Sequence, residues 1–183
     1  MAPPKPRVRF VADAMLGSLV RKLRAFGFDT TYYRAGDDAG LMRAAAREGR
    51  LILTSDRALA ERCRSRGLGV VMLDQQSDGA RLSALARGCG AIGIELVKGA
   101  PFCSLCGGGL APLGKAEVEP KVPPSVYARH RLFFRCMSCG QIYWRGTHWK
   151  KLMSLARRLD QKPVASLHSR GKAGRRARPR NPR

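Results

Sequence analysis

Two segments of similar design, VRFVAD at residues 8–13 and LILTSD at residues 51–56, set the architecture of the chain. Each is a short, mostly apolar run that leads to an aspartate, Asp13 in the first and Asp56 in the second. Continuous apolar runs of this length are typical of strands buried on both faces of a parallel sheet. Residues just past the carboxyl ends of such strands meet in one crevice, the usual place for a ligand. The sequence therefore predicts that the two aspartates lie together at one edge of a parallel sheet.

Strand and helix patterns alternate over the first hundred residues. The expected strands are apolar or β-branched runs at Val8–Ala12, Thr30–Tyr33, Leu51–Thr54 and Val70–Leu73. The expected helices carry apolar residues at helical spacing and span Met15–Phe26, Asp38–Glu48, Ala58–Arg66 and Gly79–Arg87. Repeated βα units predict an α/β fold, with a mostly parallel sheet, helices on both faces and right-handed crossovers.

Two further acids, Asp37 and Asp38, open the helical pattern between the two aspartate-bearing strands. Acidic groups that converge at one sheet edge repel one another unless a cation lies among them. Carboxylates suit Mg²⁺ or Mn²⁺, which activate a water and stabilise the leaving oxygen of a phosphodiester. The candidate catalytic residues are therefore Asp13, Asp37, Asp38 and Asp56, with Asp13, Asp38 and Asp56 as the candidate ligands of this ion.

Helix capping is the alternative explanation of these acids. Asp13, Asp38 and Asp56 each immediately precede a helical pattern, where aspartate is a favoured N-cap that stabilises a helix by about 1 kcal/mol. Capping explains less well why two of them also stand at strand ends and why the third has a second acid beside it. We therefore expect a catalytic cluster, with capping kept as the rival interpretation.

Four of the six cysteines form two CxxC pairs, Cys103–Cys106 and Cys136–Cys139, separated by 29 residues. The two-residue gap lets both thiolates of a pair bind one ion, and two pairs complete the closed tetrahedral site that suits structural zinc. An iron–sulfur centre and redox-active or unligated thiols are the alternatives. Because four protein ligands leave no position for a substrate, we expect the zinc to stabilise the fold and not to catalyse.

The sequence pattern changes near residue 98. From Gly99 to Gly146 the chain is rich in turns, lacks a helical period and has too few apolar residues to hold itself together without a metal, and a last helix is expected at Trp149–Leu159. The predicted organisation is an α/β domain at residues 7–98, a small zinc ribbon with a C-terminal helix at residues 99–160, and a basic tail, disordered when alone, at residues 161–183.

Basic side chains outnumber acidic ones by 35 to 13, which gives a net charge of +22 at pH 7. Such a charge attracts phosphate backbones and releases their counterions. A GC-rich genome also raises the arginine content of a protein, but it does not explain the shortage of acids. We expect nucleic acid or a ribonucleoprotein as the partner; the family resemblance described below implies RNA, free or in a ribosome or other ribonucleoprotein.

Individual basic and aromatic side chains are candidates for contacts with the phosphates and bases of RNA. Two arginines lie near the acids, and the aromatic and basic segment after the second cysteine pair can stack on unpaired bases while its cations bind phosphates. The favoured alternative for its aromatics is packing of the ribbon onto the α/β domain. The candidate RNA-binding residues are Arg21, Arg57, Trp144, Arg145, Lys150, Arg175 and Arg176.

No apolar stretch approaches the roughly 20 residues that a membrane-spanning helix needs. The N-terminus also lacks the apolar run of a signal peptide. We expect a soluble, cytoplasmic protein with no membrane partner.

Over about residues 8–155 the chain resembles the PIN-like ribonuclease domain of the Mut-seven C-terminal family, which a zinc ribbon follows. The motifs that carry the resemblance are FVADAMLGSLVRKLRAFGFDT (10–30), DDAGLMRAAAREGRLILTSD (37–56), CSLCGGGLAPL (103–113), VPPSVY (122–127) and CMSCGQIYWRGTHW (136–149). The resemblance implies a PIN fold and a metal-dependent RNase in which Asp13, one or both of Asp37 and Asp38, and Asp56 bind the metal. Ser55 departs from the family pattern, which usually has an arginine there.

The expected function is a metal-dependent endoribonuclease whose zinc ribbon and basic tail bind RNA. The main alternative is a non-catalytic RNA- or ribosome-binding protein that retains a PIN-like fold. A phosphoacceptor domain also places acids at parallel strand ends. That reading is weaker, because the chain lacks a good candidate lysine at a later strand end and the basic tail would be unexplained.

Overall fold

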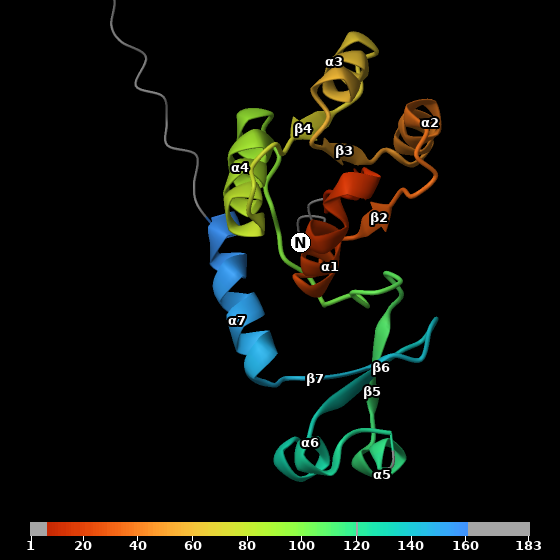
Figure 1. The fold of residues 1–183 in the computed structure, drawn as a ribbon, viewed down its shortest axis with the longest axis vertical. Helices are drawn as coiled ribbons and strands as arrows, with labels where there is room; N and C mark the ends of the chain where they lie inside the picture. Colours follow the sequence, from red (N-terminus) through yellow and green to blue (C-terminus); the bar gives the residue numbers. More distant parts are fainter. Residues whose placement is uncertain (1–6, 120, 161–183) are drawn as a thin grey trace, which may run out of the picture.

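A computed structural model describes residues 7–119 and 121–160 of the 183-residue chain. Its first part is a parallel sheet of four strands in the order β2-β1-β3-β4. The strands span Phe10–Ala12 (β1), Thr30–Tyr32 (β2), Leu51–Thr54 (β3) and Val70–Met72 (β4). The α/β class and the parallel sheet are thus confirmed (Figure 1). Three strands are one or two residues shorter than predicted, although the N–H groups of Tyr33 and Leu73, just past β2 and β4, still donate to carbonyls of the neighbouring strands.

Helices cover both faces of the sheet, as predicted. They are Gly17–Ala25 (α1), Asp38–Glu48 (α2), Arg57–Ser65 (α3) and Asp78–Ala91 (α4), and a 3-10 helix at Ala14–Leu16 (η1) precedes α1. Alternate residues of a strand point to opposite faces. Phe10 and Ala12 accordingly lie in the core under α1 and α4, whereas Val11 lies in the core under α2 and α3.

The first helix starts later than its sequence pattern predicts. The expected helix began at Met15, but the chain first makes the η1 turn and becomes α-helical only at Gly17. Met15 lies off the apolar stripe and is exposed, so no packing draws it into the helix.

The second part of the structure is an antiparallel sheet in the order β5-β6-β7, which we call the ribbon together with the two cysteine pairs. Its strands span Leu110–Leu113 (β5), Phe133–Cys136 (β6) and Ile142–Trp144 (β7). Two short helices, Lys115–Val118 (α5) and Pro124–Arg129 (α6), lie between β5 and β6 although no helix was expected there. They have four and six residues, too few to produce a visible helical period.

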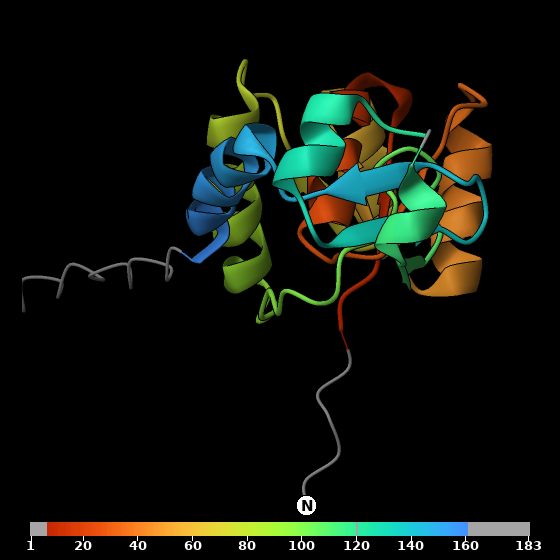
Figure 2. The ribbon, with the colours of Figure 1, turned by 90° about the horizontal axis from the view of Figure 1, so that it is seen from below.

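The last helix returns to the α/β part of the molecule. It spans Thr147–Ala156 (α7) and continues as a 3-10 helix at Arg157–Asp160 (η2). Ala156 and Leu159 are buried in the same core as α1 and α4, and both views show α7 beside α4 (Figures 1 and 2). The helix that the sequence groups with the ribbon therefore packs against the α/β core.

Arg24 on α1 joins the ribbon to the α/β part directly. Its side chain is only 6% exposed, and it donates hydrogen bonds to the carbonyl of Thr30 on β2 (2.9 Å) and to that of Leu105 in the first cysteine pair (2.8 Å). The backbone N–H of Phe102 donates to the Arg24 carbonyl at 2.9 Å. A buried guanidinium thus fixes the first cysteine pair against α1.

Two further expectations concern the C-terminal basic tail and the absence of a membrane-spanning helix. The predicted basic tail, with Arg175 and Arg176, lies outside the described residues. Within the described residues, no helix combines the length and the apolar character that crossing a membrane requires.

Candidate functional site

The four paired cysteines converge on one point in the ribbon. Their sulfur atoms all lie within 4.8 Å of one another, with 3.6 Å between Cys103 and Cys139 and 3.4 Å between Cys106 and Cys136. A tetrahedral zinc ion with bonds of about 2.3 Å holds its sulfur ligands about 3.8 Å apart. The cluster therefore fits a zinc ribbon, as the sequence predicts.

Local backbone shape explains how each pair closes around one point. The glycine after each pair, Gly107 and Gly140, has a positive φ of 85° and 74°, respectively. Residues other than glycine rarely adopt this backbone conformation. The positive φ turns the backbone so that N–H groups after the cysteine pair face the sulfur atoms. The backbone N–H of Gly108, for example, lies 3.4 Å from the Cys106 sulfur.

Tyr143 on β7 supports the buried sulfur of the first pair. Its hydroxyl lies 3.1 Å from Sγ of Cys103 and 3.2 Å from Oγ of Ser104. Burial opposes ionisation of Cys103, but hydrogen bonds from the backbone of Cys106 and from Tyr143 outweigh it and lower the pKa of this thiol to about 6. Burial and the contact with Cys103 raise the pKa of Tyr143 to about 12. The hydroxyl is therefore protonated at neutral pH and can donate to the thiolate.

Asp13 and Asp56 lie at the carboxyl edge of the parallel sheet and are joined by one buried hydroxyl. Oγ1 of Thr54, a residue with no exposed surface, donates to Oδ2 of Asp13 at 2.9 Å. The same hydroxyl accepts a hydrogen bond from the backbone N–H of Asp56 at 2.9 Å. The backbone N–H of Asp13 donates to the carbonyl of Leu53 on β3 at 3.0 Å, and this hydrogen bond extends the pairing of β1 with β3 to the carboxyl edge.

The two acids of α2 have other partners. Asp37 caps the helix by accepting from the backbone N–H of Gly40, and its Oδ2 accepts from the Tyr33 hydroxyl at 2.9 Å. The hydrogen bond from Tyr33, followed by that from Gly40, lowers the pKa of the Asp37 carboxyl. Asp38 forms an ion pair with Arg62 on α3.

These contacts test the capping interpretation residue by residue. Asp56 does cap α3 and accepts from the backbone N–H of Leu59 at 3.0 Å. The prediction that Asp38 caps its helix is wrong: Asp37 has the extended backbone of a cap, and Asp38 is already the first helical residue. Asp13 precedes η1 but makes no side-chain capping bond, so capping does not explain its position.

The structure brings together only part of the predicted acidic cluster. Among the described residues, the four cysteines are the one group of three or more Cys, His, Asp or Glu side chains close enough to hold a single ion. Asp13 and Asp56 share the Thr54 hydroxyl, whereas Asp37 and Asp38 contact Tyr33 and Arg62. A metal site built from all these acids therefore stays a prediction.

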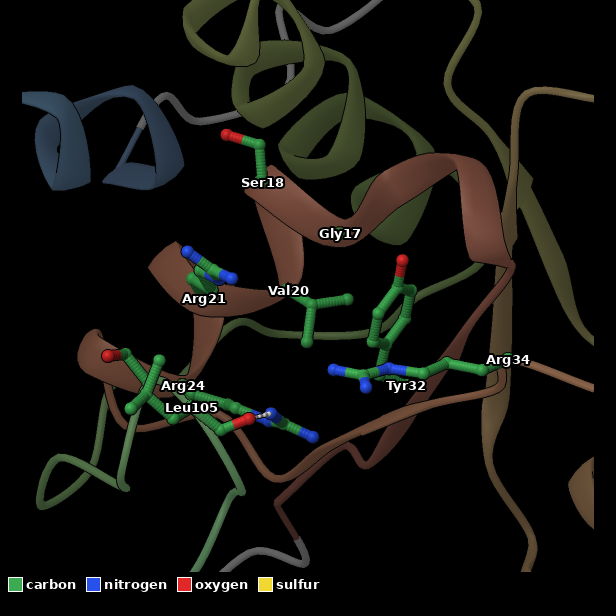
Figure 3. A pocket seen from close by; sticks show the side chains of 9 residues that line it. Gly17, Ser18, Val20, Arg21, Arg24, Tyr32, Arg34 and Leu105 are labelled. Atoms are coloured by element: carbon green, nitrogen blue, oxygen red, sulfur yellow. Dashed lines mark hydrogen bonds between the residues drawn. The ribbon is translucent and has the colours of Figure 1, made fainter. Parts of the chain in front are cut away.

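A pocket of about 400 Å³ opens beside this edge, between α1, the end of β2 and the first cysteine pair (Figure 3). We call it the arginine pocket. Its defining side chains are Arg21, Arg24, Tyr32, Arg34, Ser104 and Leu105. Sequence reasoning selected Arg21 but missed Tyr32 and Arg34. The only signal for them was their place at and just after a predicted strand end.

The other predicted RNA-binding residues that the structure describes lie on α3, on β7, just after β7 and on α7. Arg57 is exposed at the start of α3, and Lys150 is exposed on α7. Trp144 packs against the small ribbon core, and the Arg145 guanidinium lies 6.0 Å from the centroid of the Trp149 ring. Their contacts with RNA remain predictions.

A family model identifies the class of protein to which this fold and site belong. Residues 8–156 match the Mut7-C RNAse domain, and because the match covers most of the chain, the protein belongs to this family. The resemblance seen in the sequence is thus confirmed. No curated protein and no solved structure matches the chain. Membership indicates a ribonuclease-like role and, with it, the hydrolase class.

Proposed function

We propose that the protein is a metal-dependent endoribonuclease with a PIN-like domain, in which Asp13 and Asp56 form the centre of the active site. The observation that carries this proposal is the link between these two carboxylate residues through buried Thr54 at the carboxyl edge of a parallel sheet. Ligands of α/β proteins bind at such an edge, and the family of this chain is an RNase family.

Each of the two carboxylates has one oxygen held and one oxygen available. Asp13 accepts from Thr54 through Oδ2, and Asp56 caps α3 through Oδ1. Within the described part of the chain, neither of the remaining oxygens, Oδ1 of Asp13 and Oδ2 of Asp56, accepts a hydrogen bond. Fixed orientation with a free oxygen is what a cation ligand requires.

This donor set fits Mg²⁺ or Mn²⁺. Mg²⁺ is commonly bound through one or two carboxylates, and water and substrate phosphates complete its shell. When bound, such an ion supplies Lewis acidity toward a phosphodiester oxygen and toward a water. The exposed guanidinium of Arg57, directly after Asp56, would bind a substrate phosphate, and Asp37 and Asp38 would add negative charge beside the site.

The ribbon and the tail would hold the RNA in this proposal. Trp144, Arg145 and Lys150 lie on and after β7, and Arg175 and Arg176 belong to the tail. The net charge of +22 supports a polyanionic partner, either free RNA or RNA in a ribosome or other ribonucleoprotein. The four cysteines would hold structural zinc that keeps the ribbon folded.

One observation favours a second candidate, a non-catalytic RNA-binding protein. Three of the acids already have a structural role, because Asp37 and Asp56 cap helices and Asp38 pairs with Arg62. On that interpretation, replacing these acids would leave the affinity of the protein for RNA unchanged.

A cleavage assay separates the two candidates. We expect purified, zinc-loaded protein to cut RNA in the presence of Mg²⁺ or Mn²⁺, and Asp13→Asn or Asp56→Asn to lower the rate at least about 100-fold. Asparagine caps helices as well as aspartate does, so Asp56→Asn leaves α3 intact. RNA affinity should stay equal or rise, because negative charge is removed.

Asp74→Asn is the matched control, since Asp74 is exposed and follows β4 at the same edge of the sheet. It should cleave like the wild type. Absence of metal-supported cleavage, or wild-type rates in both Asp13→Asn and Asp56→Asn, would exclude the nuclease proposal in favour of the binding protein.

A further inference from the structure

Two exposed arginines of the arginine pocket, Arg21 and Arg34, carry positive charge that no carboxylate of the described residues neutralises. Arg21 and Arg34 are exposed, and within residues 7–119 and 121–160 no carboxylate lies within 4.0 Å of either guanidinium. Arg24 is buried and donates to two backbone carbonyls, and its charge is attracted by the sulfurs of Cys106 and Cys103 more strongly than it is repelled by Arg34. Two exposed guanidinium groups at one hollow can recognise an anion with several oxygen atoms, such as a phosphate.

One of these cations lies over an aromatic ring. The guanidinium of Arg34 lies 4.8 Å from the centroid of the Tyr32 ring, and Figure 3 shows the two side chains next to each other. The Tyr32 hydroxyl donates to the carbonyl of Ala14 at 2.8 Å, which fixes the ring. A guanidinium over an aromatic ring still has N–H groups that can bind a phosphate, and its side away from the ring can contact a base.

The pocket adjoins the edge at which Asp13 stands. Tyr32 is the register partner of Ala12, the residue before Asp13, and its hydroxyl bonds to Ala14, the residue after it. The strand order is β2-β1-β3, with Tyr32 on β2, Asp13 just after β1 and Asp56 just after β3. An RNA chain that runs from the pocket along this edge would therefore pass Asp13 first and Asp56 next.

The first cysteine pair forms another wall of the pocket. Ser104 and Leu105 lie between Cys103 and Cys106, and Arg24 binds the Leu105 carbonyl. The ribbon therefore shapes the pocket, although its aromatic residues Tyr143 and Trp144 are not among the residues that line it.

We propose that the arginine pocket binds one nucleotide of a single-stranded RNA. The phosphate lies between Arg21 and Arg34, and the base stacks on the outer plane of Arg34. The orientation of the next phosphodiester toward Asp13 and Asp56 rests on the proposed nuclease function, whereas the binding of RNA by the pocket does not.

Fluorescence anisotropy with a labelled single-stranded RNA tests the pocket in the full chain. Asp13→Asn serves as the background, so that cleavage cannot consume the probe. Arg21→Ala and Arg34→Ala should each raise the Kd about tenfold, because each removes a charge-assisted hydrogen bond. Each should also reduce the slope of log K against log[salt] by about 0.7 for a single strand.

Two further variants sharpen the test. Arg64→Ala removes an exposed arginine from the last turn of α3, away from the pocket, and should change the Kd less than about twofold. Arg34→Lys keeps the charge but loses the planar group, so its Kd should lie between those of the parent and Arg34→Ala. Unchanged zinc content and circular dichroism confirm that each variant is folded.

The outcomes separate this inference from the proposed function. If Arg21→Ala/Arg34→Ala binds RNA like the Arg64→Ala control, the pocket does not bind RNA, even if Asp13→Asn abolishes cleavage. If the double variant loses affinity for inorganic phosphate but not for RNA, the pocket is a small-anion site and the proposal is wrong. Loss of RNA affinity without any cleavage by the wild type supports the pocket and rejects the nuclease.

Discussion

At the scale of single residues, the hydroxyl of Thr54 determines how the two central acids are held. It has one proton, which it donates to Asp13, and it accepts from the backbone of Asp56. Since the side chain has no exposed surface, water cannot replace either bond if the hydroxyl is lost. Thr54 on β3 therefore sets the orientation of the Asp13 carboxylate, just after β1, and of the backbone at Asp56, where α3 starts.

Thr54→Val tests this arrangement, because valine keeps the β-branched shape but has no hydroxyl. The unsatisfied N–H of Asp56 should lower the free energy of unfolding by about 1–3 kcal/mol, and the cleavage rate should fall because Asp13 loses its fixed orientation. Urea unfolding and RNA cleavage measure the two effects. Thr54→Ser retains the hydroxyl and should remain close to the wild type in both; equal behaviour of the valine and serine variants would contradict the role of the hydroxyl.

At the scale of elements, local sequence patterns predicted most of the α/β part. The strand Leu51–Thr54 and the helix Asp38–Glu48 have the bounds that were predicted. A continuous apolar run marks the strand, and an apolar helical period ended by Gly49 marks the helix. The cysteine pairs were equally clear, because one ion requires their spacing.

Elements that depend on distant contacts could not be predicted. The packing of α7 on α4 and the position of Tyr32 and Arg34 beside the first cysteine pair join segments far apart in the chain. A capping aspartate next to another aspartate is also ambiguous in sequence, and only the backbone conformation shows that Asp37 is the cap.

Packing of the last helix against α4 can be measured through Leu159. This η2 residue is buried in the core that α1 and α4 share, so Leu159→Ala should lower the free energy of unfolding by about 2–5 kcal/mol. Leu132→Ala removes the same atoms from a side chain that is 64% exposed and should have little effect. Equal stabilities of the two variants would show that η2 does not pack on the α/β core.

At the scale of the whole molecule, the ribbon and the α/β part form one surface around the arginine pocket. The first cysteine pair contributes Ser104 and Leu105, the sheet contributes Tyr32, and Arg24 connects the two parts by hydrogen bonds. We therefore expect metal binding in the ribbon to affect the proposed RNA site, without a role for zinc in the chemistry.

Removal of zinc should unfold the ribbon, because binding energy of roughly 10 kcal/mol or more is the folding energy of such small metal sites. We expect a chelator to raise amide hydrogen exchange in β5–β7, with β1–β4 still protected, and to weaken RNA binding because the pocket loses a wall. Restored zinc should reverse both effects. Unchanged exchange after chelation, or purified protein without bound zinc, would contradict the assignment of the four cysteines.

The measurement that tests the central claim most directly is the binding of Mn²⁺ to zinc-loaded protein, followed by electron paramagnetic resonance. The wild type and Asp74→Asn should bind the ion alike. Asp13→Asn and Asp56→Asn should each weaken binding at least about tenfold, since each removes a carboxylate ligand. Absence of bound Mn²⁺ in the wild type, or equal affinity in all four proteins, would show that these aspartates hold no divalent ion.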